Sequence, residues 1–532
     1  MQQPARPVQL HVIHDLGGGS SKWLADFASA DDERENLVLR SFSHGSAAGS
    51  GVALYARPGD DSPIRTWRFT RAIPAVLVHH EEYRAALDEI LRDFGVAGLL
   101  VSSVIGHSLD VLDTGLPTVV VLHDYFPYCP AINLYFGSRC TRCDGQRVEE
   151  CAQGNPEFNP FADFPRDVRL AVRERFVEQV HRANVSVAVP SGSVAANLRR
   201  LDRRFDDVEF HVIPHGYGKA LSRLELHAGM MKERLRILVL GQLSVAKGLD
   251  LLRGALPAVT SFADVFLVGA REVGTIFQYT PAVQVVSQFE PDELPVHVAH
   301  ISPHVGLLPS IVPETFNYAL SELWMMGIPP VAARVGALEE RIRDGVDGFL
   351  FDPNVHALVA ALRRLDADRA ALARVHENIT SLPVRSAQEM VADYHRLLPL
   401  ASRGGEGMPS KPDEETGAMD VTLAGMWKQV KSLSLQLALA NEARHRAEMQ
   451  RLSDARRLEE ERGRSKDLAR EIAHRDTLLQ QQDRHLQALV AQRDAKAHQV
   501  DDLLGSTSWR VTRRSYRQTG AYSNSTPAGR RH

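Results

Sequence analysis

Hydrophobic residues gather in short runs over the first 400 positions, and amphipathic stretches separate these runs. The runs are apolar at nearly every position, as in residues 117–124 (PTVVVLHD) and 235–241 (LRILVLG), whereas residues 81–95 (EEYRAALDEILRDFG) carry apolar residues at helical spacing. Strands that are apolar on both faces and alternate with helices are typical of parallel sheets covered by helices on both sides. The pattern therefore predicts an α/β fold with doubly wound sheets.

This rhythm of strands and helices occurs twice, on either side of a polar bridge at residues 219–234. Predicted strands cover residues 8–14, 36–42, 96–104, 117–124, 185–191 and 210–216, and then residues 235–241, 263–270, 283–289, 304–310, 329–335 and 348–353. We expect two Rossmann-like domains, residues 1–218 and 219–400, that face each other across a cleft. Ligands of such sheets bind at the carboxyl ends of the strands.

The composition changes after residue 400. Residues 401–420 are rich in Gly, Pro and charge and are predicted to be a linker, whereas residues 421–505 contain almost no Gly or Pro. In that segment apolar residues recur at helical spacing among many charges, which predicts a long helix or an imperfect coiled coil. A single solvated helix is the alternative. Residues 506–532 hold six arginines and no acid, which indicates a disordered basic tail or a segment that lies on an anionic membrane surface.

Length and charge narrow the class of protein. With 532 residues, of which 44% are hydrophobic, the chain is too long for one core. A formal charge of −4 does not favour nucleic-acid binding. The sequence has neither an apolar run of membrane-spanning length nor a secretory signal at its start, so we expect a cytoplasmic protein, with peripheral contact to the inner face of the membrane as a candidate role of the tail.

Residues 313–331 (PETFNYALSELWMMGIPPV) place two carboxylates at the predicted start of a helix that runs from about Phe316 to Met326. Backbone N–H groups at such a start attract an anion. Glu314 and Glu322 would then accept hydrogen bonds from the two ends of an elongated ligand, such as a nucleotide sugar. Alternatively, Glu314 only complements the helix dipole, a stabilisation of about 0.3–1 kcal/mol, and Glu322 faces water.

The Glu-x7-Glu spacing, together with residues 331–351 (VAARVGALEERIRDGVDGFLF), resembles the donor site of family-four retaining glycosyltransferases of the GT-B fold. Four further segments resemble that family in the same order. They are residues 15–28 (DLGGGSSKWLADFA), 121–126 (VLHDYF), 212–217 (VIPHGY) and 241–252 (GQLSVAKGLDLL). The resemblance covers about residues 8–400.

The resemblance implies a role for each matching residue. Glu314 would hold the hydroxyls of the transferred sugar, Glu322 those of the ribose, and His123 would contact the sugar. Lys247 would neutralise the charge that grows on the leaving diphosphate. Further substrate contacts are expected from Gly18, Gly19, Gln242 and the backbone amides of Thr315, Phe316 and Asn317. The alternative for Lys247 is an ordinary surface lysine on a helix. The alternative for His123 is a histidine that only closes the end of a strand.

One position departs from the family pattern. Gln242 stands where many relatives have an arginine that grips the diphosphate together with the lysine. Losing that cation weakens phosphate binding unless Arg271 or Arg334 replaces it.

The implied function is transfer of a sugar from a nucleotide-diphosphate sugar to a saccharide or lipid-linked acceptor in bacterial surface polysaccharide synthesis. The reaction is expected to retain the configuration of the sugar and to require no metal or other cofactor. The helical tail would mediate self-association or recruit pathway partners. Two alternatives stay open, namely a non-catalytic coiled-coil scaffold, which Gln242 favours, and a nucleotide-sugar epimerase on the same fold.

All four cysteines fall within a short segment, at Cys129, Cys140, Cys143 and Cys151. This spacing includes one Cys-x-x-Cys, and four thiolates are a typical ligand set for structural zinc. Such a zinc would order the loop of the acceptor-side domain and take no part in catalysis. Four reduced thiols are the alternative.

Overall fold

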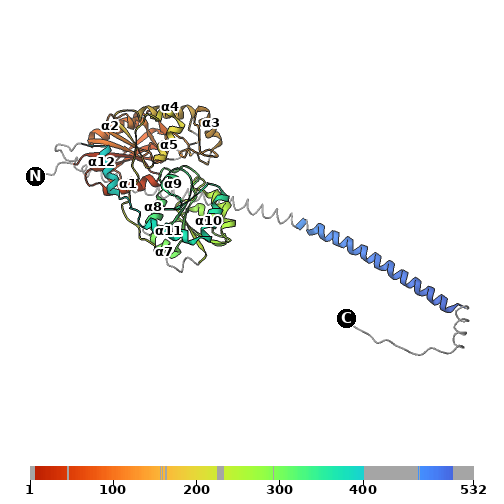
Figure 1. The fold of residues 1–532 in the computed structure, drawn as a ribbon. Helices are drawn as coiled ribbons and strands as arrows, with labels where there is room; N and C mark the ends of the chain where they lie inside the picture. The colour runs from red at the N-terminus through yellow and green to blue at the C-terminus, as the bar shows by residue number, and fades with distance from the viewer. Residues whose placement is uncertain are drawn as a thin grey trace. The chain divides into compact units, whose positions relative to one another are not determined.

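The computed structural model describes residues 6–44, 47–155, 157–158, 160–161, 164–224, 233–290, 293–400, 465–466 and 468–506. The chain forms two compact units, Met1–Lys411 and Pro412–His532 (Figure 1). The predicted linker, residues 421–464 of the predicted helical segment and residues 507–532 of the basic tail lie outside the described residues.

The first domain is built on an eight-stranded sheet. In sheet order its strands are β10 (Phe210–Val212), β9 (Val185–Val189), β8 (Thr118–Val121), β6 (Val96–Val101), β1 (Val8–His14), β2 (Glu35–His44), β3 (Ala47–Tyr55) and β4 (Arg65–Ile73). The six strands from β10 to β2 are parallel, and β3 and β4 extend the sheet in antiparallel fashion. A small second sheet pairs β5 (Val76–Leu77) with β7 (His107–Ser108).

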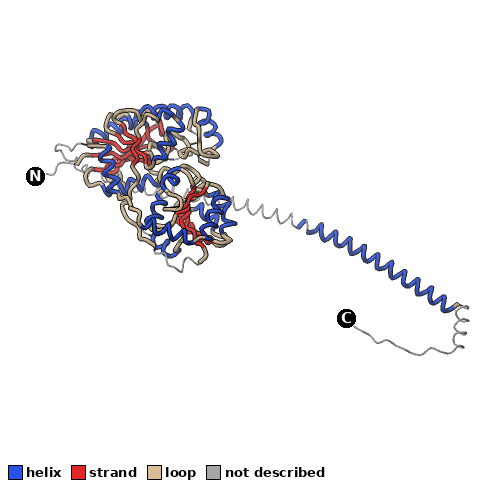
Figure 2. The backbone as a smooth tube through the Cα atoms, viewed as in Figure 1, coloured by secondary structure: helices blue, strands red, loops and turns tan. Residues whose placement is uncertain are grey.

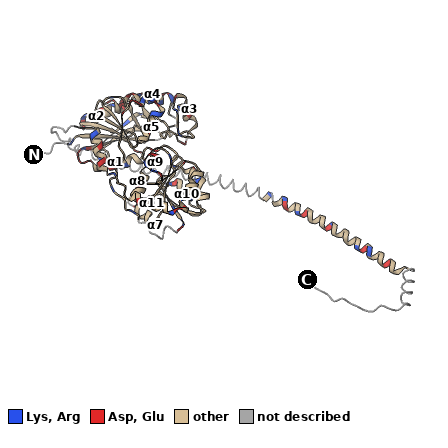
Figure 3. Cartoon of the chain, in the orientation of Figure 1, with Lys and Arg blue, Asp and Glu red and all other residues tan. Residues whose placement is uncertain are grey.

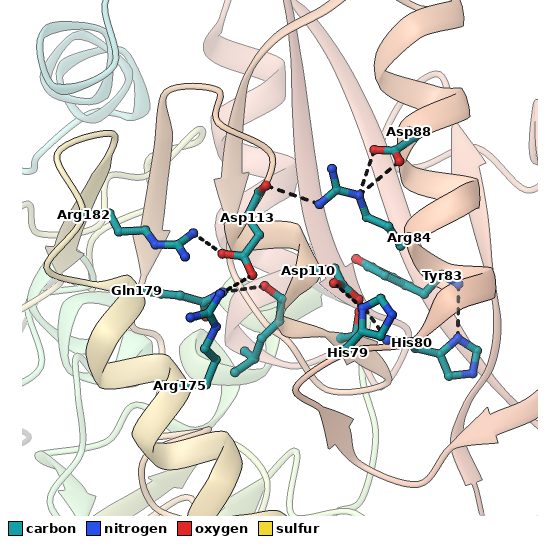
Figure 4. A network of polar contacts seen from close by, with 12 residues as sticks. His79, His80, Tyr83, Arg84, Asp88, Asp110, Asp113, Arg175, Gln179 and Arg182 are labelled. Carbon is teal, nitrogen blue, oxygen red and sulfur yellow. Dashed lines mark hydrogen bonds and ion pairs between the residues drawn. The ribbon is translucent and has the colours of Figure 1, made fainter.

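Helices cover both faces of this sheet, as Figure 2 shows. They are α1 (Gly19–Ala30), α2 (Glu81–Asp93), η1 (Leu109–Leu112), α3 (Gly145–Gly154), α4 (Arg166–Gln179), α5 (Gly192–Leu201) and η2 (Arg203–Phe205). A polar network ties α2, η1 and α4 together (Figure 4): the Asp113 carboxylate accepts hydrogen bonds from Arg175 and Arg182, and its carbonyl accepts one from Arg84.

The second domain has a six-stranded, fully parallel sheet. Its strands, in sheet order, are β13 (Val283–Val286), β12 (Ala263–Val268), β11 (Leu235–Leu240), β14 (Val305–Leu308), β15 (Pro330–Ala333) and β16 (Phe349–Phe351). Its helices are α6 (Leu249–Val259), η4 (Glu272–Phe277), α7 (Leu294–Ile301), α8 (Tyr318–Met325), α9 (Gly336–Arg341), α10 (Val355–Ala367) and α11 (Arg369–Thr380). The predicted pair of doubly wound α/β domains is confirmed.

The strand order of the second sheet reverses between β11 and β14. The helices that follow these two strands, α6 and α8, therefore lie on opposite faces of the sheet and pack in different buried clusters. Such a topological switch point is where ligands bind in open parallel sheets.

The last helix of the first unit, α12 (Ala387–Leu397), follows the second domain in sequence but packs on the first. Met390 and Tyr394 share one buried cluster with Trp23 and Phe27 of α1. Arg34 also donates a hydrogen bond of 2.7 Å to the carbonyl of Leu398. Residues 387–398 thus join the two domains through the core of the first.

The second unit contains a long helix at residues 468–505, so the prediction of a C-terminal helix is confirmed for that range. Acidic and basic residues are interspersed along it, as Figure 3 shows. None of the helices in the described ranges combines the length and the apolar character that crossing a membrane requires.

Candidate functional site

Two loops meet at the switch point of the second sheet, one after β11 and one after β14. Gly248, at the end of the first loop, has a left-handed φ of 85°, and a Cβ at this position would overlap the carbonyl of Pro309 in the second loop. Only glycine permits this close approach of the two backbones. The approach brings Lys247 of one loop next to Glu314 of the other.

Lys247 and Glu314 form a tight ion pair. The ammonium nitrogen lies 2.5 Å from Oε1 and 2.7 Å from Oε2 of the carboxylate. Ser310 Oγ also donates to Oε1, and Asn317 Nδ2 lies 3.3 Å from it. The Glu314 side chain is 9% exposed, whereas that of Lys247 is 44% exposed. The carboxylate is therefore fixed, and the ammonium has room to move to another anion.

Burial raises the pKa of Glu314, but the Lys247 charge and the hydrogen bonds from Lys247, Ser310 and Asn317 outweigh it, so the net pKa lies below its usual value. Glu314 is ionised at neutral pH. An ionised carboxylate only accepts hydrogen bonds, so it suits the hydroxyl groups of a sugar.

The start of α9 holds the backbone of Glu314 in place. Ala337 N donates a 2.9 Å hydrogen bond to the Glu314 carbonyl. Gly336, at φ 56°, lies so close that a Cβ there would be 2.7 Å from both the N and the O atom of Glu314. The carboxylate is thus positioned from both sides of its loop.

Helix α8 begins at Tyr318, two residues later than predicted, and its first turn faces the first domain. Asn317 caps it at φ 70°, and its side chain accepts from Leu320 N. Among the described residues, the backbone N–H groups of Thr315, Phe316 and Asn317 have no hydrogen-bond acceptor. Free N–H groups at a helix N-terminus are an anion site.

Two histidines adjoin this helix start, the half-buried His123 and the buried His215. His123 lies 5.0 Å from Trp23 and 5.1 Å from His215, measured between ring centroids. His215 lies 4.5 Å from Phe316 and stacks on Tyr318 at 5.4 Å. Within the described residues, His123 Nε2 and His215 Nδ1 are buried without a hydrogen-bond partner.

Burial is the main reason why both imidazoles are neutral. It lowers the pKa of His123 to about 3 and holds that of His215 well below its usual value. A neutral imidazole offers one donor and one acceptor nitrogen, so each ring can still hydrogen-bond a sugar hydroxyl. His123 was predicted from the sequence. His215 was missed, although it lies in the linker segment that resembles the family.

Arg341 was also missed. Its guanidinium donates to the carbonyls of Phe316 (2.6 Å) and Asn317 (3.1 Å) and to Ser321 Oγ (2.6 Å), and it lies 3.9 Å from the centre of the Phe316 ring. Burial lowers the pKa of Arg341 to about 10, so the side chain stays charged at neutral pH. It therefore adds positive charge beside the free N–H groups.

Glu322 lies apart from this group. Burial raises its pKa, Lys22 opposes that effect, and Asp26 adds to it, so the carboxylate adjoins α1 of the first domain. Lys22 pairs with Asp26 at 3.3 Å and lies over the rings of Tyr217 (5.2 Å) and Tyr318 (5.5 Å). The two glutamates of the motif thus have different surroundings.

The glycine-rich first loop faces the same helix. A Cβ on Gly18, at φ 89°, would meet no atom within 4 Å, and one on Gly19 would lie 3.6 Å from the Tyr318 ring. Backbone at these positions leaves space beside α8 for a bound group.

The side chain that stands in place of the family arginine, Gln242, is exposed. Of the two candidate replacements, Arg334 forms ion pairs with Asp344 at 3.1 Å and with Asp352 at 3.9 Å. Arg271 is exposed after β12 and forms no ion pair with any described residue. Of the two, only Arg271 is therefore without an ion pair among the described residues.

The four cysteines line one cavity in the first domain. Arg173 donates to Cys143 Sγ at 3.2 Å, and Asn155 donates to Cys151 Sγ at 3.3 Å. Burial raises the pKa of Cys140 to about 11, so its thiol is protonated at neutral pH. In the described ranges, no group of three or more His, Cys, Asp or Glu side chains is arranged to hold a metal ion. Zinc binding, which stays a prediction, would require these side chains to rotate.

Comparison with known proteins agrees with the fold. Residues 234–368 match the family described as glycosyl transferases group 1. Sucrose-phosphate synthase from Thermosynechococcus elongatus aligns over 74% of this chain and 98% of its own, with 16% identity and a TM-score of 0.50. Anabaena HepE in complex with UDP-glucose aligns over 73% and 99%, with 14% identity and a TM-score of 0.46. A search of curated protein sequences found no match.

The first unit therefore has the α/β architecture of GT-B glycosyltransferases. The matched segment contains β11 to β16 and holds both Lys247 and Glu314.

Proposed function

We propose that the protein is a glycosyltransferase that moves a sugar from a nucleotide-diphosphate sugar to a saccharide or lipid-linked acceptor. The observation that carries this proposal is the pairing of Lys247 with the buried Glu314 next to the free N–H groups of Thr315, Phe316 and Asn317. Glu314 supplies a carboxylate for sugar hydroxyls, Lys247 an ammonium that can move to the diphosphate, and the N–H groups a site for a phosphate. A nucleotide-diphosphate sugar presents all three of these groups.

In this proposal the distal phosphate binds at the N–H groups before α8, where Arg341 adds charge. Lys247 leaves Glu314 when the diphosphate arrives and neutralises the negative charge that grows as the bond between sugar and phosphate breaks. Positive groups fixed where charge develops stabilise the transition state more than the bound substrate. Glu314 and the neutral imidazole of His123 then orient the sugar.

The resemblance to retaining enzymes supports a reaction on one face of the sugar ring. The bond from the anomeric carbon to the diphosphate breaks, a bond from the same carbon to the acceptor oxygen forms, and the acceptor proton passes to a phosphate oxygen. Lys247 and the amides supply the positive charge, so the proposal requires no metal. An acceptor from bacterial surface polysaccharide synthesis, and work at the inner face of the membrane, are parts of the same proposal.

Binding and transfer test the proposal separately. Melting is followed with UDP, GDP and dTDP, because a ligand at 100 times its dissociation constant stabilises a protein by about 2.7 kcal/mol. Transfer is followed with labelled nucleotide sugars and membrane lipid extract. Lys247→Ala is expected to lower the rate about 10²- to 10³-fold, the usual effect of removing one group that stabilises developing charge. Glu339→Ala, which removes an exposed carboxylate on α9, is the matched control and should leave the rate unchanged.

A scaffold without catalytic activity is the second candidate, and the uncharged Gln242 is the observation that favours it. A scaffold would melt at the same temperature with and without each nucleotide, in the wild type and in Lys247→Ala alike. An epimerase would instead change a nucleotide sugar in the absence of any acceptor. Either result would overturn the proposed transfer.

A further inference from the structure

The helix at residues 468–505 carries an apolar seam that no other described residue of the second unit covers. Apolar residues recur at every seventh position except one, where Arg493 stands. They are Ile472, Leu479, Leu486 and Val500. Leu468, Leu489 and Leu503 each lie one turn from the nearest of these four. We call these seven residues the seam. Leu479 and Leu486 are 60% and 61% exposed, as on an isolated helix.

The spacing of the seam is that of a coiled coil. A helix has 3.6 residues per turn, so a strict seven-residue repeat stays on one face only when two helices wind around each other. The described residues of the second unit form this helix alone, so they supply no second helix. A partner helix must therefore come from outside these described residues.

Charged residues inside the repeat exclude one arrangement. Arg475, Arg493 and Lys496 occupy positions of the same repeat as the seam. In a parallel pair in register, every residue of the repeat meets its own copy. Three layers would then press like charges together, which destabilises a pair.

An antiparallel pair removes these repulsions. When Leu486 faces Leu489 of a second copy, Ile472 faces Leu503 of that copy. Each cation then meets an uncharged residue. Arg475 faces Val500, which Asp501 follows, and Arg493 faces Gln482, which Asp483 follows. Lys496 faces Leu479 and can extend its ammonium group to solvent.

We propose that this helix binds the same helix of a second copy of the chain in antiparallel orientation, with Leu486 opposite Leu489. The seam supplies the contact, and the placement of Arg475, Arg493 and Lys496 selects the orientation. The inference stands independently of the proposed sugar transfer.

The mass of the full chain in solution tests the pairing. Light scattering after size exclusion should give a dimer for the wild type and a monomer for the double variant Leu479→Asp/Leu486→Asp. Ala491→Asp places one negative charge on the opposite face of the helix and should leave the dimer intact. A monomeric wild type, or a dimer that survives the double variant, would overturn the proposal. Unchanged melting of the first unit confirms that the variants fold.

Disulfide trapping tests the orientation. Ile472→Cys chains and Leu503→Cys chains are mixed under oxidised glutathione, and the joined peptides are identified by mass spectrometry. The antiparallel register predicts disulfides between positions 472 and 503. The four natural cysteines lie in the first domain and give different peptides. A disulfide between two copies of position 472 would indicate a parallel pair and contradict the proposal. The absence of a disulfide between positions 472 and 503 would also contradict it, as would a complex that forms only with a different protein.

Discussion

At the scale of single residues, Lys247 and Glu314 differ in burial, so removing either one has different consequences. Lys247→Ala leaves a buried carboxylate without its counter-ion, and breaking a buried pair in this way costs about 3–5 kcal/mol. The ammonium is 44% exposed and partly screened by water, which reduces our expectation to about 1–2 kcal/mol of unfolding free energy at pH 7. Urea unfolding measures the loss.

The same pair gives a pH dependence with a defined sign. The folded pKa of Glu314 is depressed, so its stabilisation is present above the unfolded pKa and is lost as the pH falls through the folded pKa. The difference between wild type and Lys247→Ala should therefore be largest near neutral pH and vanish in acid. Adding Glu314→Gln to Lys247→Ala should remove the pH-dependent part. A difference that stays constant from pH 7 to pH 3 would contradict this assignment.

These two residues could be identified from the sequence one at a time but not as a pair. They are 67 positions apart, and only the crossing of the loops after β11 and β14 joins them. His215 and Arg341 were missed for a related reason. Both lie in segments that resemble the family, residues 212–217 and 331–351, but Arg341 acts through backbone carbonyls and His215 through ring packing. The sequence does not show which residues make such contacts.

At the scale of elements, the loop between β11 and α6 depends on Gly248. Gly248→Ala introduces a left-handed alanine, which costs about 1–2 kcal/mol, and also an overlap with the Pro309 carbonyl. We therefore expect Gly248→Ala to lower the unfolding free energy by more than that range. It should also weaken nucleotide binding, because the change displaces Lys247.

Gly115→Ala is the matched control for this change. Gly115 has a left-handed φ of 76°, and a Cβ at this position would meet no atom within 4 Å, so only the backbone strain applies. Equal effects of the two substitutions on denaturant unfolding would show that the contact with Pro309 does not hold the loop.

The cysteine segment before and within α3 gives a second prediction at this scale. Four thiols line one cavity, and the prediction from the sequence is one zinc per chain after purification without chelators, bound once these side chains rotate toward it. Cys140→Ser with Cys143→Ser should abolish it and lower the melting temperature. Elemental analysis decides the question, since a zinc-free wild type would leave four packed thiols.

Elements were predictable where both faces are buried, as in β8 and β11. β3 and β4 were missed. β4 alternates intermediate and exposed residues and carries several charges, whereas the consecutive buried run of β3 covers only residues 51–54. An exposed antiparallel edge lacks the continuous apolar run that identified the parallel strands.

At the scale of the whole molecule, the position of α12 was beyond sequence reasoning. Its amphipathic pattern indicates a helix with one buried face but does not say which domain that face covers. The structure gives the answer through Tyr394, whose ring lies 5.4 Å from Trp23 and 5.6 Å from Phe27. Helix α12, near the end of the first unit, therefore packs against α1 near the start of that unit.

Tyr394 stabilises this junction by packing alone, which predicts opposite outcomes for two substitutions. Removing a large buried aromatic side chain costs about 3–5 kcal/mol, so Tyr394→Ala should lower the unfolding free energy by that amount. The buried hydroxyl has no hydrogen-bond partner among the described residues. Because an unpaired buried hydroxyl is unfavourable, Tyr394→Phe should be neutral or stabilising by up to about 1 kcal/mol. Tyr279→Ala, at a side chain that is 89% exposed, controls for the loss of a tyrosine. Calorimetry compares the three, and a Tyr394→Phe variant as unstable as Tyr394→Ala would mean that the hydroxyl, and not the ring, joins α12 to the first domain.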